Sequence, residues 1–333
     1  MEIRQTMEKR KIGRSPLEVS AVGLGLMSMS GIYGNANDEE SISLIHYALD
    51  KGINLLDSAD MYGWGHNEQL LGRALKGWRH KAIVATKFGQ TKDASGKQGV
   101  DGRPEYVMQA CEASLKRLGI DVMDLYYQHR VDPNTPIEET VGAMKRLVEQ
   151  GKVRALGLSE ARPETIRRAH KIHPIAAVQN EYSLLYRTEG EETLRTTREL
   201  GIGFVPYAPL GRSMLTGTVH GKADVPEGDR RLQHPRFQGE NLDRNVQLVS
   251  RLESIAREKK CTPAQLVLAW LLAQGSDIVP IPGTKRKQRV DENLAALDIR
   301  LSKEELKRIS DAAPAGAGAG TRYPADAMKR VYL

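Results

Sequence analysis

Four polar residues of different chemistry, Asp57, Tyr62, Lys87 and His129, stand at or just after the ends of apolar runs. Asp57, Lys87 and His129 each end a run of their own, and Tyr62 follows Asp57 by five residues. Taken singly, Asp57 is better explained as a helix or loop cap, Lys87 as a surface ammonium and His129 as a hydrogen-bonded histidine at the barrel rim. Together, on three successive strands, they would bring a carboxylate, a phenol, an ammonium and an imidazole to one edge of a sheet.

This set of groups suits the reduction of a carbonyl compound. A carbonyl that accepts a hydride must also receive a proton on its oxygen, and a tyrosine with a pKa of ~10 is a poor donor at neutral pH. A nearby Lys87 ammonium would lower the pKa of Tyr62, and Asp57 would hold Lys87 charged and in place. His129 would hydrogen-bond the carbonyl oxygen. The hydride itself requires a cofactor, because no side chain can supply it.

The segments that carry these residues alternate between two patterns. Short runs rich in Val, Ile and Leu are separated by amphipathic segments with helical spacing, which is typical of a parallel sheet covered on both sides. Strands are predicted at Val19–Leu26, Asn54–Ser58, Ala82–Lys87, Met123–His129, Arg154–Ser159, Ala176–Glu181, Gly203–Ala208 and Asp277–Pro282. Helices are predicted at 38–51, 67–75, 104–118, 137–150, 163–170, 191–200, 245–259, 263–274 and 287–297.

Eight such units favour an α/β protein with a closed (β/α)₈ TIM barrel, whose active site lies at the C-terminal ends of the strands. An open doubly wound sheet is the alternative. Its nucleotide-binding loop would need G-x-G-x-x-G after the first strand, and here Gly23 and Gly25 lack the third glycine.

One domain is expected over residues 1–333, with three additions to the barrel: an N-terminal β-hairpin in residues 1–20, a long loop at 211–243 and a C-terminal tail at 313–333. A loop of this length is usually a lid or a binding loop. The tail is rich in small residues and is expected to pack loosely near one barrel face.

Composition narrows the choice of partners. The net charge is +7, from 49 Lys and Arg against 42 Asp and Glu, but the charges are interleaved and aromatic residues make up only 5%. This disfavours nucleic-acid binding and leaves room for a basic pocket that takes a phosphorylated small molecule. No apolar run reaches the ~18 residues of a membrane span, and the N-terminus has no apolar signal region. Cys111 and Cys261 form neither a disulfide framework nor a zinc cluster. A cytoplasmic protein without a metal is expected, and the sequence does not predict its oligomeric state.

Several short segments carry a family resemblance, in chain order: Leu55–Ala59 with Met61–Gly63, Gly65 with Asn67 and Glu68, Ala85–Lys87, Asp124–Arg130, Gly157–Ser159, Val178–Leu184, Pro206–Gly211, Ile281–Thr284, and Arg289 with Glu292 and Asn293. Through them the chain, from about Arg10 to residue 297, resembles the aldo-keto reductase family. The resemblance is strongest to the microbial and plant branch of broad-specificity aldehyde and ketone reductases.

The resemblance implies a barrel that reduces aldehydes, and possibly ketones, with NADPH. Tyr62 would be the general acid, and Asp57, Lys87 and His129 would complete a catalytic tetrad. Ser159 and Gln179 would bind the nicotinamide carboxamide, and Tyr207 would stack on the nicotinamide ring. The remaining implied cofactor residues are Leu210, Gly211 and Arg212 at the pyrophosphate, Thr284, Lys285 and Arg289 at the 2′-phosphate, and Glu292 and Asn293 at the adenine. Gly283 is also expected to line the cofactor site, but some members have Lys there, so the phosphate contacts would come from Lys285 and Arg289.

The basic residues from Lys285 to Arg289 support a phosphate site independently, because they stand where the last strand meets a helix N-terminus. Without the resemblance, a solvated basic face explains them better. Glu160 departs from the family pattern, which often has Asn there; its carboxylate would alter cofactor affinity or point to solvent.

The substrate pocket is expected to be lined by Met27, Tyr33, Trp64 and Arg130, with residues of the 211–243 loop. Each has an alternative explanation. Met27 could fill the core, and Trp64 could pack within its loop. Arg130 could attract anionic substrates or form a structural ion pair.

Two other functions remain open on the same barrel. One is a regulatory or binding subunit that senses a bound nucleotide with little turnover. The other is an aldolase that uses Lys87 to form a Schiff base, which would leave Tyr62, Ser159, Gln179 and Tyr207 unexplained.

Overall fold

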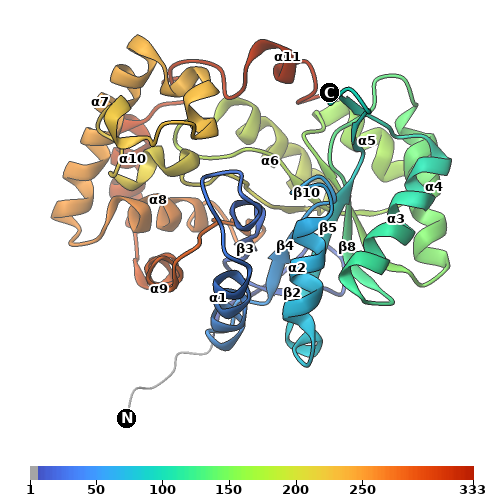
Figure 1. Ribbon diagram of the computed structural model, residues 1–333. Helices are drawn as coiled ribbons and strands as arrows, with labels where there is room; N and C mark the ends of the chain where they lie inside the picture. The colour runs from blue at the N-terminus through green and yellow to red at the C-terminus, as the bar shows by residue number, and fades with distance from the viewer. Residues whose placement is uncertain (1–6) are drawn as a thin grey trace.

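A computed structural model describes residues 7–333 as an α/β structure built on a curled parallel sheet (Figure 1). Its strands are β1 (Lys9–Lys11), β2 (Glu18–Ser20), β3 (Leu24–Gly25), β4 (Leu55–Asp57), β5 (Ile83–Phe88), β6 (Gln90–Lys92), β7 (Gln98–Val100), β8 (Met123–Gln128), β9 (Val153–Ser159), β10 (Ile175–Gln179) and β11 (Gly203–Phe204). Its helices are α1 (Asp38–Asp50), α2 (His66–Leu75), α3 (Pro104–Leu118), α4 (Ile137–Glu149), α5 (Pro163–Ile172), α6 (Thr188–Leu200), α7 (Gly239–Glu258), α8 (Pro263–Leu272), α9 (Lys287–Ala295), α10 (Lys303–Ala312) and α11 (Ala325–Met328).

Seven strands pair in parallel in the order β3-β4-β5-β8-β9-β10-β11. The segment 278–283 closes the sheet into a (β/α)₈ barrel, because Ile278 bridges Phe204 of β11 and Gly283 bridges Gly25 of β3. The eighth predicted strand, Asp277–Pro282, is therefore present as extended backbone with isolated bridges. Its two prolines, Pro280 and Pro282, have no N–H to donate to a regular ladder, which explains the interruption.

Gly23 and Gly25 make this closure possible. A Cβ on Gly25 would lie 2.9 Å from the carbonyl oxygen of Ile281, and one on Gly23 would lie 2.9 Å from the Ile281 side chain. These glycines therefore allow two backbone segments to approach closely, rather than forming a nucleotide loop.

The predicted N-terminal hairpin is confirmed where the chain is described: β1 pairs with β2 in antiparallel register, and residues 1–6 lie outside the described part. Ile12 and Leu17 from its turn region join the buried cluster that includes Leu55 and Leu125 of the barrel strands. Arg10 donates hydrogen bonds to the carbonyls of Ile278 (2.6 Å) and Gly275 (2.9 Å). The hairpin is thus bound to the barrel by both apolar and polar contacts.

All nine predicted helices are present, within a few residues at their ends. Strands β6 and β7, which form a hairpin, were not predicted, and neither were α10 and the single turn α11. The long loop ends at Gln238, because α7 begins at Gly239 rather than near residue 245. Within residues 7–333, no helix combines the length and apolarity needed to cross a membrane.

Candidate active site

Asp57, Tyr62, Lys87 and His129 come together at the C-terminal ends of neighbouring strands. The fully buried Lys87 Nζ donates to Asp57 Oδ1 at 2.5 Å, to the Ser58 carbonyl at 2.7 Å and to the Tyr62 hydroxyl at 3.3 Å. The rings of Tyr62 and His129 meet edge to face, with centroids 5.9 Å apart. Parallel pairing places Asp57 on β4, Lys87 on β5 and His129 just after β8, which is why residues far apart in sequence share one site.

Burial and charge act against each other on these groups. Burial lowers the pKa of the Lys87 ammonium, but Asp57 and Tyr62 together outweigh this effect, so the pKa is raised. Burial raises the pKa of Tyr62, and Lys87 only partly offsets the rise. The expected lowering of the Tyr62 pKa is therefore not the net result in the protein alone. The phenol stays protonated at neutral pH, with a cation beside it that can stabilise the phenolate.

His129 is neutral at physiological pH. Burial, with the nearby charges of Arg130 and Lys87, holds its pKa well below 6.5. Its Nδ1 is buried without a hydrogen-bond partner among the described residues, and the ring lines a cavity. A neutral imidazole in this position can donate one hydrogen bond to a carbonyl oxygen.

Two further polar side chains connect to this cluster. Gln179, at the end of β10, donates from Nε2 to Asp57 Oδ2 at 2.8 Å, which leaves its Oε1 available as an acceptor. Arg130 donates from Nη1 to the His129 carbonyl at 2.7 Å and to Ser159 Oγ at 3.3 Å.

The cluster opens into a cavity of about 670 Å³, large enough for a drug-sized ligand. Most predicted site residues line it: Met27, Tyr33, Asp57, Tyr62, His129, Arg130, Ser159, Gln179, Tyr207, Leu210, Arg212, Gly283, Thr284, Lys285, Arg289, Glu292 and Asn293. Lys87 and Gly211 lie behind the lining. Trp64 is also absent from it, because this residue is 44% exposed and packs with the Lys92 ammonium 5.6 Å from its ring centre.

The far end of the cavity is basic. Lys285, Arg286 and Arg289 come from the segment that starts α9, and Arg289 pairs with Glu292. Lys285 Nζ donates to the backbone carbonyls of Tyr33 and Asn35, each at 2.8 Å. The start of a helix with several guanidinium and ammonium groups suits a phosphate.

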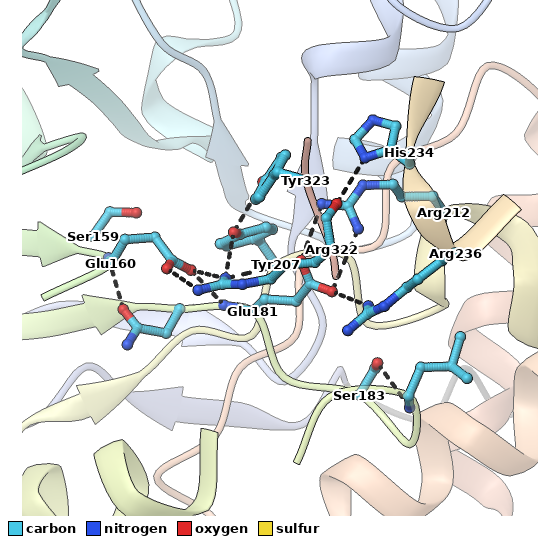
Figure 2. A network of polar contacts seen from close by, with 12 residues as sticks. Ser159, Glu160, Glu181, Ser183, Tyr207, Arg212, His234, Arg236, Arg322 and Tyr323 are labelled. Carbon is cyan, nitrogen blue, oxygen red and sulfur yellow. Dashed lines mark hydrogen bonds and ion pairs between the residues drawn. The ribbon is translucent and has the colours of Figure 1, made fainter. Parts of the chain in front are cut away.

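A buried network of ions borders the other side of the cavity (Figure 2). Arg322, which is 1% exposed, pairs with both oxygens of Glu160 at 2.6 and 2.5 Å and donates to the Tyr207 hydroxyl at 3.1 Å. Glu181 pairs with Arg212 at 3.0 Å and with Arg236 at 2.7 Å. Burial raises the pKa of Glu181, but the arginines, Arg212 first, outweigh burial and hold it at about 2.

This network corrects two expectations. Glu160 neither points to solvent nor faces the cavity, since Arg322 occupies both of its oxygens. The C-terminal tail does not pack loosely, since Arg322 is buried and its carbonyl accepts from His234 Nδ1 at 2.7 Å. The strand ends, the long loop and the tail are therefore joined around Tyr207.

Sequence reasoning missed the contribution of the tail to the cavity. Tyr323 lines the cavity, and its hydroxyl forms a 3.0 Å hydrogen bond with the hydroxyl of Tyr207. Ala327, Arg330 and Val331 line it as well. The signal was the change from small residues to Thr-Arg-Tyr-Pro after residue 320, because a charged and aromatic segment needs partners that a loose tail would not have.

The chain is similar to known proteins over most of its length. The model of the aldo/keto reductase family matches residues 21–314. A protein named probable aldo-keto reductase 1, from Glycine max, is 50% identical over 315 residues, which covers 94% of this chain and 91% of the relative. A protein from Schizosaccharomyces pombe named aldo-keto reductase yakc [NADP(+)] is 45% identical over 330 residues, with 97% and 96% covered.

Solved structures resemble the whole barrel. The glycerol dehydrogenase AKR11B4 from Gluconobacter oxydans matches with a TM-score of 0.84 at 31% identity, over 91% of this chain and 94% of that one. The holo form of aldo-keto reductase AKR11C1 from Bacillus halodurans matches with a TM-score of 0.79 at 31% identity, over 93% and 97%.

Proposed function

Because this chain belongs to the aldo/keto reductase family, whose members carry out oxidoreduction of carbonyl compounds, we propose that it reduces aldehydes, and some ketones, to alcohols with NADPH. One observation carries the proposal: Lys87 Nζ lies between Asp57 Oδ1 at 2.5 Å and the Tyr62 hydroxyl at 3.3 Å, at the edge of a cavity. This arrangement serves proton donation and leaves the hydride to a cofactor.

The residues present fit NADP(H). The basic side chains of Lys285 and Arg289 line the cavity where α9 starts, which suits the 2′-phosphate. At the other end, Ser159 and the free Oε1 of Gln179 suit the nicotinamide carboxamide. Tyr207 would lie against the ring, Leu210 to Arg212 against the pyrophosphate, and Glu292 and Asn293 against the adenine. The cofactor, when bound, supplies the hydride.

Tyr62 is the proposed general acid. Its phenol is protonated at neutral pH, since burial raises its pKa. When the proton moves to the substrate oxygen, the phenolate that remains is stabilised by the Lys87 ammonium. Asp57 keeps that ammonium charged and oriented, and Gln179 in turn fixes Asp57 through the 2.8 Å hydrogen bond.

His129 is proposed to orient the carbonyl. As a neutral ring on the cavity wall it donates a hydrogen bond to the substrate oxygen next to Tyr62. It does not compete with Tyr62 as a proton donor, because its pKa lies well below neutrality.

Oxidation of NADPH, followed at 340 nm with a panel of aldehydes and ketones, tests this function. We expect Tyr62→Phe to lower kcat by roughly 10²–10⁴-fold, as the loss of a general acid does, while NADPH binding is kept. Tyr106→Phe is the matched control, because this half-buried tyrosine on α3 is not part of the cavity lining. Turnover near that of the wild type in Tyr62→Phe would exclude the mechanism.

A further inference from the structure

Among residues 7–333, Arg130 is a buried cation that forms no ion pair. Four arginines of the described chain are at most 9% exposed: Arg10, Arg130, Arg236 and Arg322. Three of them pair with a carboxylate: Arg10 with Glu8 at 2.9 Å, Arg236 with Glu181 at 2.7 Å and Arg322 with Glu160 at 2.5 Å. Arg130 forms no ion pair within residues 7–333, although buried charges are normally paired.

The hydrogen bonds of Arg130 leave much of its guanidinium free. Nη1 donates to the His129 carbonyl and to Ser159 Oγ, whereas Nε and Nη2 make no hydrogen bond to any described residue. Glu160 is near enough to favour the charged form of Arg130, but both of its oxygens are occupied by Arg322. The free donors belong to a side chain that lines the cavity.

The position of Arg130 indicates whether an anionic partner for its guanidinium would belong to the cofactor or to the substrate. Arg130 adjoins His129 and Ser159, and its charge acts on Tyr62 and His129. The groups that suit cofactor phosphates lie elsewhere, on the 210–212 segment and at the start of α9. The nicotinamide end of the cofactor has no anionic group, so an anion beside Arg130 must come from the substrate.

We propose that Arg130 is a substrate-binding residue that selects carbonyl compounds carrying a carboxylate. This inference rests on the proposed function and names its substrate class. A guanidinium with free N–H groups binds a carboxylate through paired, charge-assisted hydrogen bonds. Arg330 from the tail lines the same cavity and also lacks a carboxylate partner in the described chain.

Matched substrates separate the charge from the reacting carbonyl. The probes are 3- and 4-carboxybenzaldehyde and the methyl esters of both, assayed at pH 7 with saturating NADPH. For at least one isomer we expect the wild type to favour the acid over its ester in kcat/KM by about 10-fold or more, as one charge-assisted pair allows. Arg130→Gln should lower this acid-to-ester ratio by about the same factor, and Arg130→Lys should keep part of it.

Arg162→Gln is the matched control. It removes the same charge from an exposed side chain outside the lining, two residues after Glu160, and should leave the ratio unchanged. Two results would overturn the inference while leaving the reductase function intact. One is a wild type whose kcat/KM is no higher for either acid than for its ester. The other is an Arg130→Gln variant whose kcat/KM falls equally for each acid and its ester. A wild type that reduces none of the four aldehydes, nor any other of the panel, would instead reject the proposed function and this inference with it.

Discussion

Asp60 stands in the chain between Asp57 and Tyr62, yet its carboxyl group takes no part in the hydrogen bonds that join Lys87 to Asp57 and Tyr62. Its Oδ1 is buried and has no hydrogen-bond partner among the described residues. Burial, reinforced by the nearby Glu68 carboxylate, raises the pKa of Asp60 to about 8, even though Arg117 acts in the opposite direction. The folded protein therefore holds a proton at pH 7 that the unfolded chain releases.

The sign of the resulting pH dependence follows from linkage. In the unfolded chain Asp60 titrates near its ordinary value of 3.8, and in the folded protein near 8. The stability from its protonated form is complete below pH 4 and is lost as the pH rises towards 8. Asn cannot ionise, so its side chain does not lose this stability. We therefore expect the difference in free energy of unfolding between Asp60→Asn and the wild type to grow in favour of the variant, by up to about 4 kcal/mol, as the pH rises from 5 to 8.

Urea unfolding at both pH values measures this difference. Asp326→Asn is the control, because Asp326 is an exposed residue of the tail whose partner in the described chain is the exposed Lys329. An equal effect of Asp60→Asn at pH 5 and pH 8 would show that the Asp60 carboxyl is ionised in the folded protein.

The proposed catalytic residues could be predicted because each follows an apolar run, and a parallel barrel gathers such positions on one face. The same logic places Arg130 at the pocket, but it predicts neither whether Arg130 has an ion-pair partner nor the protonation of Asp60. Whether a charged side chain has a partner depends on residues far away in the sequence, as for Arg10 and Ile278, which are separated by 268 positions. The position of Trp64 outside the cavity lining was not predictable for a related reason, since its ring is 44% exposed and contacts Lys92.

At the scale of elements, the C-terminal tail is the addition whose role differs most from expectation. The amphipathic helices and buried strands were predictable from their periodicity. The tail has no such period, and α11 is a single turn of four residues. Its place is set by Arg322 and Tyr323, which act through tertiary contacts with Glu160 and Tyr207. Figure 1 shows α11 and the C-terminus beyond the ends of the strands.

The Glu160–Arg322 pair makes this role testable. Removing Arg322 leaves the Glu160 carboxylate buried without its partner, which typically costs about 3–5 kcal/mol. We therefore expect Arg322→Ala to destabilise the protein strongly in denaturant unfolding and to raise the KM for substrate. The double variant Glu160→Gln/Arg322→Met should recover part of the stability, because no unpaired charge remains.

Arg308→Ala is the control for this experiment, since Arg308 pairs with Glu258 on the exposed surface and should change stability little. If Arg322→Ala and Arg308→Ala behave alike, the tail is not held by the buried pair.

At the scale of the whole molecule, buried and paired arginines lie at one end of the cavity, and accessible basic residues lie at the other. Around Tyr207 and Glu181 the arginines are buried and mostly paired, whereas Lys285, Arg286 and Arg289 at the other end are largely accessible. This division was only partly predictable: the basic run is visible in the sequence, but the paired network requires the folded barrel to bring the strand ends, the long loop and the tail together.

Cofactor preference should follow from the accessible end. We expect Arg289→Ala to weaken NADPH binding by about 10–100-fold, because a guanidinium–phosphate contact is lost, with little effect on NADH, which lacks the 2′-phosphate. Equilibrium titration of both cofactors measures this. Arg300→Ala removes an exposed arginine outside the cavity and is the control. Equal losses for NADPH and NADH would place the 2′-phosphate elsewhere.

The ion pair between Glu160 and Arg322 also has a consequence for the order in which the chain folds. Its partners are 162 positions apart, so during synthesis the first half of the barrel leaves the ribosome long before Arg322 does. Until then Glu160 lacks its ion-pair partner Arg322, and the wall around Tyr207 is incomplete. Early folding intermediates can therefore contain most of the barrel's secondary structure and still lack a finished active site. In refolding, enzymatic activity should return with the docking of the tail, after the helical signal has recovered.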